Sequence, residues 1–157
     1  MAPGELRLSD RLRRFFRPFL TGAERRLVAK AIAAAERRTT GEIHVHLCGR
    51  LGGRDPLDAA REKFLELGMD KTKARNGVII LVADLERRFA VWGDKGIYEA
   101  AGQLLWDRAS DILGERLREG RAADGLVACV EAVGRELARL FPYEPGDTNE
   151  LSDEVSG

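Results

Sequence analysis

Residues 74–96 read ARNGVIILVADLERRFAVWGDKG, and this stretch decides the fold. The apolar run from Val78 to Ala83 has the length and the β-branched content that are typical of a strand covered on both faces. A short polar break separates it from a second apolar segment, 89–92, so the two are predicted to form a β-hairpin. Antiparallel pairing brings the start of the first strand and the end of the second to one edge of the sheet. We therefore expect Asn76 and Asp94 to lie side by side on a polar, glycine-lined rim.

The segments around the hairpin predict a mixed sheet flanked by helices. Residues 42–48 alternate between polar and apolar side chains with period two, which predicts a third strand. A predicted helix lies between this strand and the hairpin, and a strand–helix–strand succession favours parallel pairing with a right-handed crossover. The predicted strands are 42–48, 77–83 and 87–92, and the predicted helices are 21–39, 55–67, 103–119 and 122–140.

The length of the chain indicates a single domain, and its charge argues against nucleic acid as a partner. A chain of 157 residues fits one domain, with a core large enough to fold without a metal or a disulfide. Lys and Arg together number 26 and so do Asp and Glu, so the net charge is zero and nucleic acid is not an expected partner. We divide the chain into a basic N-terminal arm (1–20), an α/β domain (21–141) and an acidic, disordered tail (142–157).

The basic arm, 1–20, leaves two interpretations open. Three phenylalanines lie among five arginines there, so the arm could dock on an anionic membrane surface or on a partner. It could instead fold back on its own domain, which we favour because Pro18 limits any helix to a few turns. No run of about 18 apolar residues occurs, so no transmembrane segment is predicted. The arm lacks the apolar core of a signal peptide, and we expect a cytoplasmic protein with Cys48 and Cys129 as free thiols.

One face of the strand at 42–48 carries His44, His46 and Cys48. Imidazole and thiolate are zinc ligands, so this face is a candidate metal site. The sequence offers no CxxC pair and no further histidine to complete the site. We therefore favour a half-buried strand face that packs against a helix, and we do not expect His46 to act as a catalytic base.

Carboxylates gather near the predicted rim. Phosphate-binding, dinucleotide-binding, nucleophile-elbow and calcium-loop motifs are all missing from the sequence. The acidic residues that remain around the rim are Asp70, Asp94, Glu99 and Asp107. Hard oxygen ligands of this kind suit calcium or magnesium, although an acidic residue in a glycine turn is more often a turn former or a helix cap. No nucleophile is indicated there, so an enzyme at this edge would have to use metal-activated water or a carboxylate.

Three segments of the chain are distinctive: TGEI at 40–43, RNGVIILVA at 75–83 and RFAVWGDKGI at 88–97. Together they resemble the TPM-domain family, which includes the thylakoid-lumen acid phosphatase and photosystem II repair proteins. The resemblance covers about residues 21–141 and implies a three-layer α/β/α sandwich with a small mixed sheet. It also implies weak phosphatase activity in some members and divalent metal binding in others. By position, Asn76-Gly77 corresponds to the family's asparagine-glycine pair, and Gly93 and Gly96 correspond to its glycine turn. Glu99 corresponds to the acidic residue after that turn, and Asp107 corresponds to a later aspartate. Arg75 stands where many members repeat asparagine.

Together, the residues and the resemblance predict that the protein is a divalent-cation-binding module. The cation, calcium or magnesium, is assigned to Asp94, Glu99, Asp107 and Asp70. A weak metal-assisted phosphomonoesterase is the alternative, with Arg75, Asn76 and Lys95 binding the substrate. The expected partner is a protein or a small phosphorylated ligand.

Overall fold

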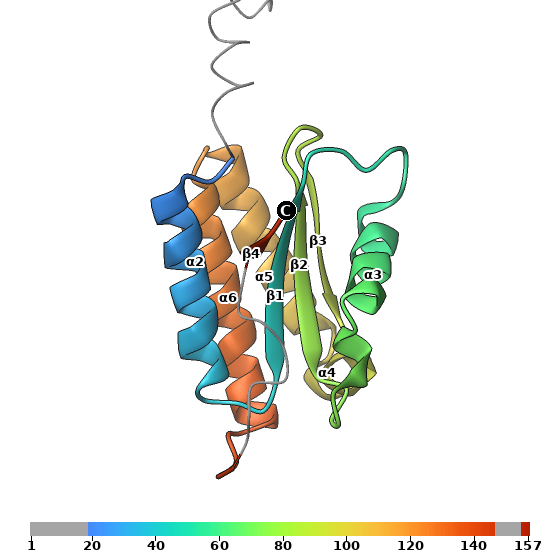
Figure 1. Cartoon of the computed structure of the whole chain (residues 1–157), viewed down its shortest axis with the longest axis vertical. Helices are drawn as coiled ribbons and strands as arrows, with labels where there is room; N and C mark the ends of the chain where they lie inside the picture. The colour runs from blue at the N-terminus through green and yellow to red at the C-terminus, as the bar shows by residue number, and fades with distance from the viewer. Residues whose placement is uncertain (1–18, 147–154) are drawn as a thin grey trace, which may run out of the picture.

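The computed structural model describes residues 19–146 and 155–157 of the chain. A four-stranded sheet with the order β3-β2-β1-β4 lies between helices on both of its faces (Figure 1). The strands are β1 (Glu42–Cys48), β2 (Gly77–Ala83), β3 (Arg88–Gly93) and β4 (Val155–Ser156). The helices are α2 (Gly22–Glu36), α3 (Pro56–Glu66), α4 (Lys95–Ala101), α5 (Gln103–Arg118) and α6 (Ala122–Leu140), with a short 3-10 turn, η1 (Met69–Lys71).

The pairing of the strands makes the sheet mixed. β1 runs parallel to β2 and also to β4, whereas β2 and β3 form the antiparallel hairpin. Helices α2, α5 and α6 cover one face, and α3 covers the other (Figure 1). The predicted three-layer α/β/α sandwich with a small mixed sheet is thereby confirmed.

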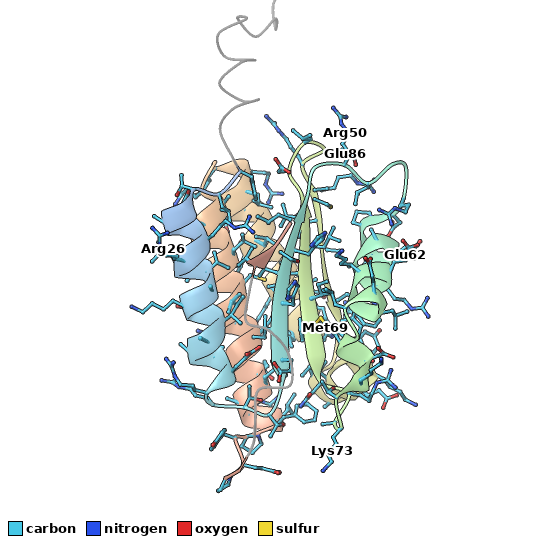
Figure 2. All side chains as sticks on the ribbon, in the orientation of Figure 1. Arg26, Arg50, Glu62, Met69, Lys73 and Glu86 are labelled. Carbon is cyan, nitrogen blue, oxygen red and sulfur yellow. The ribbon has the colours of Figure 1, made fainter. Side chains whose placement is uncertain are left out.

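Strand β2 is apolar throughout because both of its faces are covered. Val78, Ile80 and Val82 pack in the cluster beneath α2, α5 and α6, and Ile79 and Leu81 pack in the cluster beneath α3. Each is at most 2% exposed, and full burial of such a side chain contributes about 1.5–3 kcal/mol. Figure 2 shows the side chains filling the space between the layers.

Capping explains where two of the helices begin. The Thr21 hydroxyl accepts from the Glu24 amide at 3.1 Å, and the Glu24 carboxylate accepts from the Thr21 amide at 2.9 Å, which is a complete capping box. Asp55 caps α3, and Pro56 occupies its first turn. Helix α2 ends at Glu36, earlier than predicted, because Thr39 leaves the helix to bridge with Pro142 after α6.

Two short elements differ from the sequence expectation. Helix α4 occupies Lys95–Ala101, which lie between the predicted strand 87–92 and the predicted helix 103–119 and were assigned to neither. The prediction of a disordered tail over 142–157 is wrong for Val155–Ser156, which pair with β1, while residues 147–154 lie outside the described part of the chain. Residues 1–18 of the predicted basic arm also lie outside it, whereas Leu20 is 2% exposed and belongs to the core. No helix among the described residues is long and apolar enough to cross a membrane.

Candidate functional site at the rim of the sheet

The rim lies at one end of the sheet and is formed by the loops 39–41 before β1 and 72–76 before β2, together with the junction at Asp94 between β3 and α4. Figure 2 labels Lys73 in the second loop and so marks this end of the molecule. The Asp94 amide donates to the Gly77 carbonyl at 2.9 Å, which places Asp94 beside the start of β2. The prediction that Asn76 and Asp94 share one edge is confirmed.

The Asp94 carboxylate lies at the centre of the rim and is paired with Arg75. Arg75 Nε lies 2.6 Å from Asp94 Oδ2, and Arg75 Nη2 lies 2.9 Å from Asp94 Oδ1. The Asp94 side chain is 3% exposed, while that of Arg75 is 49% exposed. The hydrogen bonds and the charge of Asp94 raise the pKa of Arg75, and the charge of Asp70 raises it further. A guanidinium at the surface therefore neutralises a buried carboxylate.

The same residues complete the N-terminus of α4. Asp94 Oδ1 accepts from the Lys95 amide at 2.8 Å. The Arg75 carbonyl accepts from the Gly96 amide at 2.8 Å and from the Ile97 amide at 3.3 Å. The first amides of a helix are its usual anion-binding groups, and here these three are already bonded within the chain.

A glycine is required at position 96 because the backbone of the preceding loop lies against it. A Cβ at Gly96 would lie 2.1 Å from the Ala74 carbonyl oxygen and 2.7 Å from that of Arg75. Arg75 itself has a φ of 51°, in the left-handed region that non-glycine residues seldom adopt. This backbone turns the Arg75 carbonyl toward α4 while its side chain reaches Asp94.

Of the three predicted substrate-binding residues, Asn76 is buried. It is 1% exposed, and its Nδ2 donates to Thr40 Oγ1 at 3.1 Å. Asn76 therefore ties the loop before β2 to the loop before β1. Lys95 is exposed on the first turn of α4, and Arg75 is engaged by Asp94.

The four predicted metal ligands do not form one cluster. Asp70 lies in η1, where its charge acts on Arg75. Glu99 and Asp107 are exposed on α4 and α5, and Asp107 accepts from Gln103 Nε2 at 3.1 Å. Within residues 19–146 and 155–157, no three His, Cys, Asp or Glu side chains form a group that could hold a metal ion. The structure therefore brings together Asp94 and Arg75, with the charge of Asp70 acting on that pair, rather than a preformed four-carboxylate site.

The second candidate metal face, on β1, is largely buried, with His46 and Cys48 only partly exposed. His44 is 8% exposed, and Cys48 packs against the cluster beneath α3. Burial lowers the pKa of His46 to about 4, with smaller contributions from Lys63 and His44. An imidazole with this pKa is neutral near pH 7.

Sequence reasoning missed two partners at these sites. It assigned Arg75 to a substrate, although the arginine pairs with Asp94, 19 residues further along the chain. It also missed Ser156, whose hydroxyl lies 2.7 Å from His46 Nδ1. The sequence carried a signal only for the pairing of Arg75 with Asp94, because the predicted hairpin brings the residue before Asn76 close to Asp94.

Comparison with known proteins identifies the family. The TPM domain matches residues 16–136 of the chain. Among solved structures, the BA42 protein of the psychrophilic bacterium Bizionia argentinensis is 37% identical, with a TM-score of 0.83 over 90% of this chain and 97% of that one. No curated protein matches the chain in sequence.

Two more distant structures share the fold. The N-terminal domain of cg2496 from Corynebacterium glutamicum is 19% identical, with a TM-score of 0.62 over 75% of this chain and 74% of that one. The N-terminal domain of a P. gingivalis protein is 22% identical, with a TM-score of 0.63 over 80% of this chain and 82% of that one. The match to the TPM domain covers most of the chain, and the chain therefore belongs to the TPM-domain family.

Proposed function

We propose that this TPM-domain protein is a binding module whose rim takes a divalent cation at Asp94 in exchange for the Arg75 guanidinium. The observation that carries the proposal is the contrast between a carboxylate that is 3% exposed and a cationic partner that is 49% exposed. A buried carboxylate needs a positive partner, because an unpaired buried charge is costly. The partner supplied by the chain sits at the surface, where water can solvate it after it leaves.

The chemistry of the rim favours calcium or magnesium over zinc. The ligands that the rim offers are carboxylate oxygens, which hard divalent cations prefer. The four carboxylates predicted from the sequence are not a preformed cage, so the proposal assigns the cation to Asp94. Asp70 is the other carboxylate whose charge acts on Arg75, and it is the candidate second ligand.

The described residues favour binding over hydrolysis. A phosphomonoesterase needs an activated nucleophile and groups that hold the phosphate. The first-turn amides of α4 are bonded to Asp94 and to the Arg75 carbonyl, and the Arg75 guanidinium is bonded to Asp94. We accordingly propose a protein or a small phosphorylated ligand as a bound partner, which would approach the exposed Lys95.

We also propose a cytoplasmic location for the protein. The two cysteines, Cys48 and Cys129, are both free thiols. Free thiols are typical of a reducing compartment.

Calorimetric titration of metal-stripped protein with calcium and with magnesium tests the exchange. We expect Arg75→Gln to bind the cation at least about tenfold more tightly than wild type, because the competing guanidinium is gone. Asp94→Asn should abolish binding at this site. Arg139→Gln is a matched control, since Arg139 pairs with Glu136 on the exposed surface of α6.

Two results would contradict the proposal. One is the failure of both wild type and Arg75→Gln to bind either cation at millimolar concentrations. The other is cation binding that survives Asp94→Asn unchanged. Circular dichroism of each variant establishes that a loss of binding does not reflect unfolding. Hydrolysis of a phosphomonoester that depends on the cation and is lost in Asp94→Asn would favour the phosphatase instead.

A further inference from the structure

A second feature lies at the edge of β1, where the short segment 155–157 completes the sheet. Val155 pairs with Val45, and Ser156 pairs with His46, in a parallel ladder of two residues. β1 is seven residues long, so this ladder is much shorter than the strand that carries it. The exposed edge of a sheet is a template for an added strand, and proteins use such edges to bind extended peptides.

The first two positions of the segment each meet a distinct environment. Val155 packs against the core cluster beneath α2, α5 and α6. The Ser156 hydroxyl lies 2.6 Å from His44 Nε2 and 2.7 Å from His46 Nδ1, on the opposite face of the sheet. A hydroxyl can donate one hydrogen bond and accept another, so it bridges one imidazole nitrogen that accepts and one that donates.

The third position accepts only a glycine. Gly157 has a φ of 116°, a conformation that L side chains rarely adopt. A Cβ at this position would lie 1.8 Å from the Leu47 carbonyl oxygen and 2.7 Å from the Leu47 carbonyl carbon. Both contacts are with backbone, which has no flexible end that could move aside. The edge therefore selects an apolar residue, a serine and a glycine in succession.

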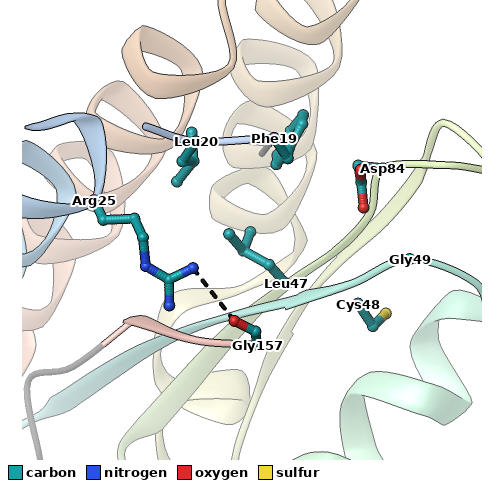
Figure 3. Close-up of a pocket in the computed structure, with 8 residues that line it drawn as sticks. All are labelled: Phe19, Leu20, Arg25, Leu47, Cys48, Gly49, Asp84 and Gly157. Atoms are coloured by element: carbon teal, nitrogen blue, oxygen red, sulfur yellow. Dashed lines mark hydrogen bonds between the residues drawn. The ribbon is translucent and has the colours of Figure 1, made fainter. Parts of the chain in front are cut away.

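Arg25 on α2 holds the main chain of the same segment. Its Nη2 donates to the Val155 carbonyl at 2.8 Å. Its Nη1 donates to the Gly157 oxygen at 3.3 Å, and Figure 3 shows this second hydrogen bond. Main-chain contacts add affinity without reading sequence, whereas the serine and glycine positions provide the selectivity. Arg25 comes from a helix and the histidines from the strand, so two elements converge on one tripeptide.

An open pocket of about 230 Å³ continues beyond Gly157. Figure 3 shows Phe19 and Leu20 on one side of it and Cys48 and Asp84 on the other. The pocket therefore leaves room for a bound peptide to continue past the position of Gly157. This pocket lies at the Cys48 end of β1, whereas the rim lies at the Glu42 end, so the two sites occupy opposite ends of the strand.

We propose that the edge of β1 is a binding site for an extended peptide strand with the sequence apolar–serine–glycine. The partner is a polypeptide that presents such a segment, and residues 155–157 occupy the site in cis as a competitor. A two-residue ladder makes few main-chain hydrogen bonds, and the Ile43 amide at the start of β1 already donates to the Glu36 carboxylate at 2.8 Å. A partner strand that continues past the glycine into the pocket would gain contacts that the cis segment lacks and would displace it. This proposal is independent of the cation site at the rim.

Fluorescence polarisation with the full chain tests the proposal. The probe is a labelled peptide with the sequence of residues 150–157, blocked at both ends. In the full-length variant Gly157→Val the added side chain should expel the cis segment and leave Arg25 and both histidines in place. We expect this variant to bind the probe at least about tenfold more tightly than wild type, because the attached competitor is removed.

Altered probes test the selectivity of the site in the Gly157→Val protein. A probe with valine at the position of Ser156 loses the bridge between the histidines. A probe with valine at the position of Gly157 meets the Leu47 backbone. We expect each to bind at least about tenfold more weakly than the parent probe. Adding Arg25→Gln should weaken every probe to a similar degree. Lys30→Gln, an exposed change on the same helix, is the matched control.

Ser156→Val provides a second test if Gly157→Val does not fold. It removes the hydroxyl that bridges His44 and His46 from the chain's own segment, and it should also raise the affinity for the parent probe. The proposal is overturned if neither variant binds the probe at millimolar concentration, or if the valine-for-serine probe binds as well as the parent. A wild-type dimer that dissociates in Ser156→Val would overturn the assignment to a separate partner, because a second copy would then be the occupant.

Discussion

Arg75 donates two hydrogen bonds to the carboxylate of Asp94, from Nε at 2.6 Å and from Nη2 at 2.9 Å, across the turn that joins β3 to α4. The same carboxylate caps α4 through the Lys95 amide. One buried side chain therefore fixes the loop before β2 and the start of the helix after β3. The rim depends on this residue for its shape as well as for its charge.

Replacing Asp94 with alanine should destabilise the protein. The change removes a helix cap and two charge-assisted hydrogen bonds, so we expect the free energy of unfolding to fall by about 2–3 kcal/mol. Urea unfolding followed by circular dichroism measures the change. Asp107→Ala removes an exposed carboxylate on α5 and should stay within about 0.5 kcal/mol of wild type. Equal effects of the two substitutions would contradict a structural role for Asp94.

Replacing Gly96 with alanine should also be destabilising, because its Cβ would lie 2.1 Å from the Ala74 carbonyl oxygen. We expect a loss of about 2 kcal/mol, since backbone must shift to admit the methyl group. Gly22→Ala is the matched control, because the nearest atom to its Cβ is the Arg26 guanidinium at 3.5 Å. A smaller effect at Gly96 than at Gly22 in the same urea assay would show that the loop yields easily.

The fold was predictable where the sequence carried a local pattern. β2 could be placed because its apolar run is covered on both faces, and β1 because its alternation matches the pleat. Helix α4 was missed because it has seven residues and contains Gly96, which lowers helix propensity. Its first turn is stabilised by the Arg75 carbonyl, a tertiary contact that no helical pattern reveals.

The candidate sites were predictable only as far as topology decides them. The hairpin alone places Asn76 and Asp94 at one edge. It does not decide which way a helical side chain points, and Glu99 and Asp107 are exposed on α4 and α5. The contact of Ser156 with His46 spans 110 residues and involves a two-residue strand, so neither periodicity nor spacing could predict it.

The two cysteines should differ in reactivity with a thiol reagent such as DTNB. Cys129 is fully buried in α6, and burial raises the pKa of its thiol to about 12. Cys48 is partly exposed at the end of β1, although burial also raises the pKa of its thiol. We expect slow labelling of Cys48 in the native protein and labelling of Cys129 only on unfolding, because thiolate is the reactive form. Cys48→Ser should then show no native labelling, and fast labelling of that variant would contradict the burial of Cys129.

The stability of the protein should depend on pH through the partly buried imidazole of His46. Burial is the largest cause that lowers the pKa of His46 from 6.5 to about 4; the charges of Lys63 and His44 also lower it, and Glu66 opposes them. Between these two values the unfolded chain binds a proton that the folded chain does not. The stability contributed by neutral His46 is therefore fully present above pH 6.5 and is lost as the pH falls toward 4.

Proton NMR of the imidazole resonances measures this titration directly. We expect the His46 signal in the folded protein to stay unshifted from pH 8 down to about 5 and to move only below that. His46→Gln should melt at a temperature that falls less between pH 7 and 5 than that of wild type, because the variant lacks the group that takes up the proton on unfolding. Ser156→Ala removes only the hydroxyl beside the ring and should leave most of the lowering of the pKa in place, since burial is its largest cause. A midpoint near 6.5 in the folded protein would mean that water reaches the ring freely and that this face of β1 is not buried.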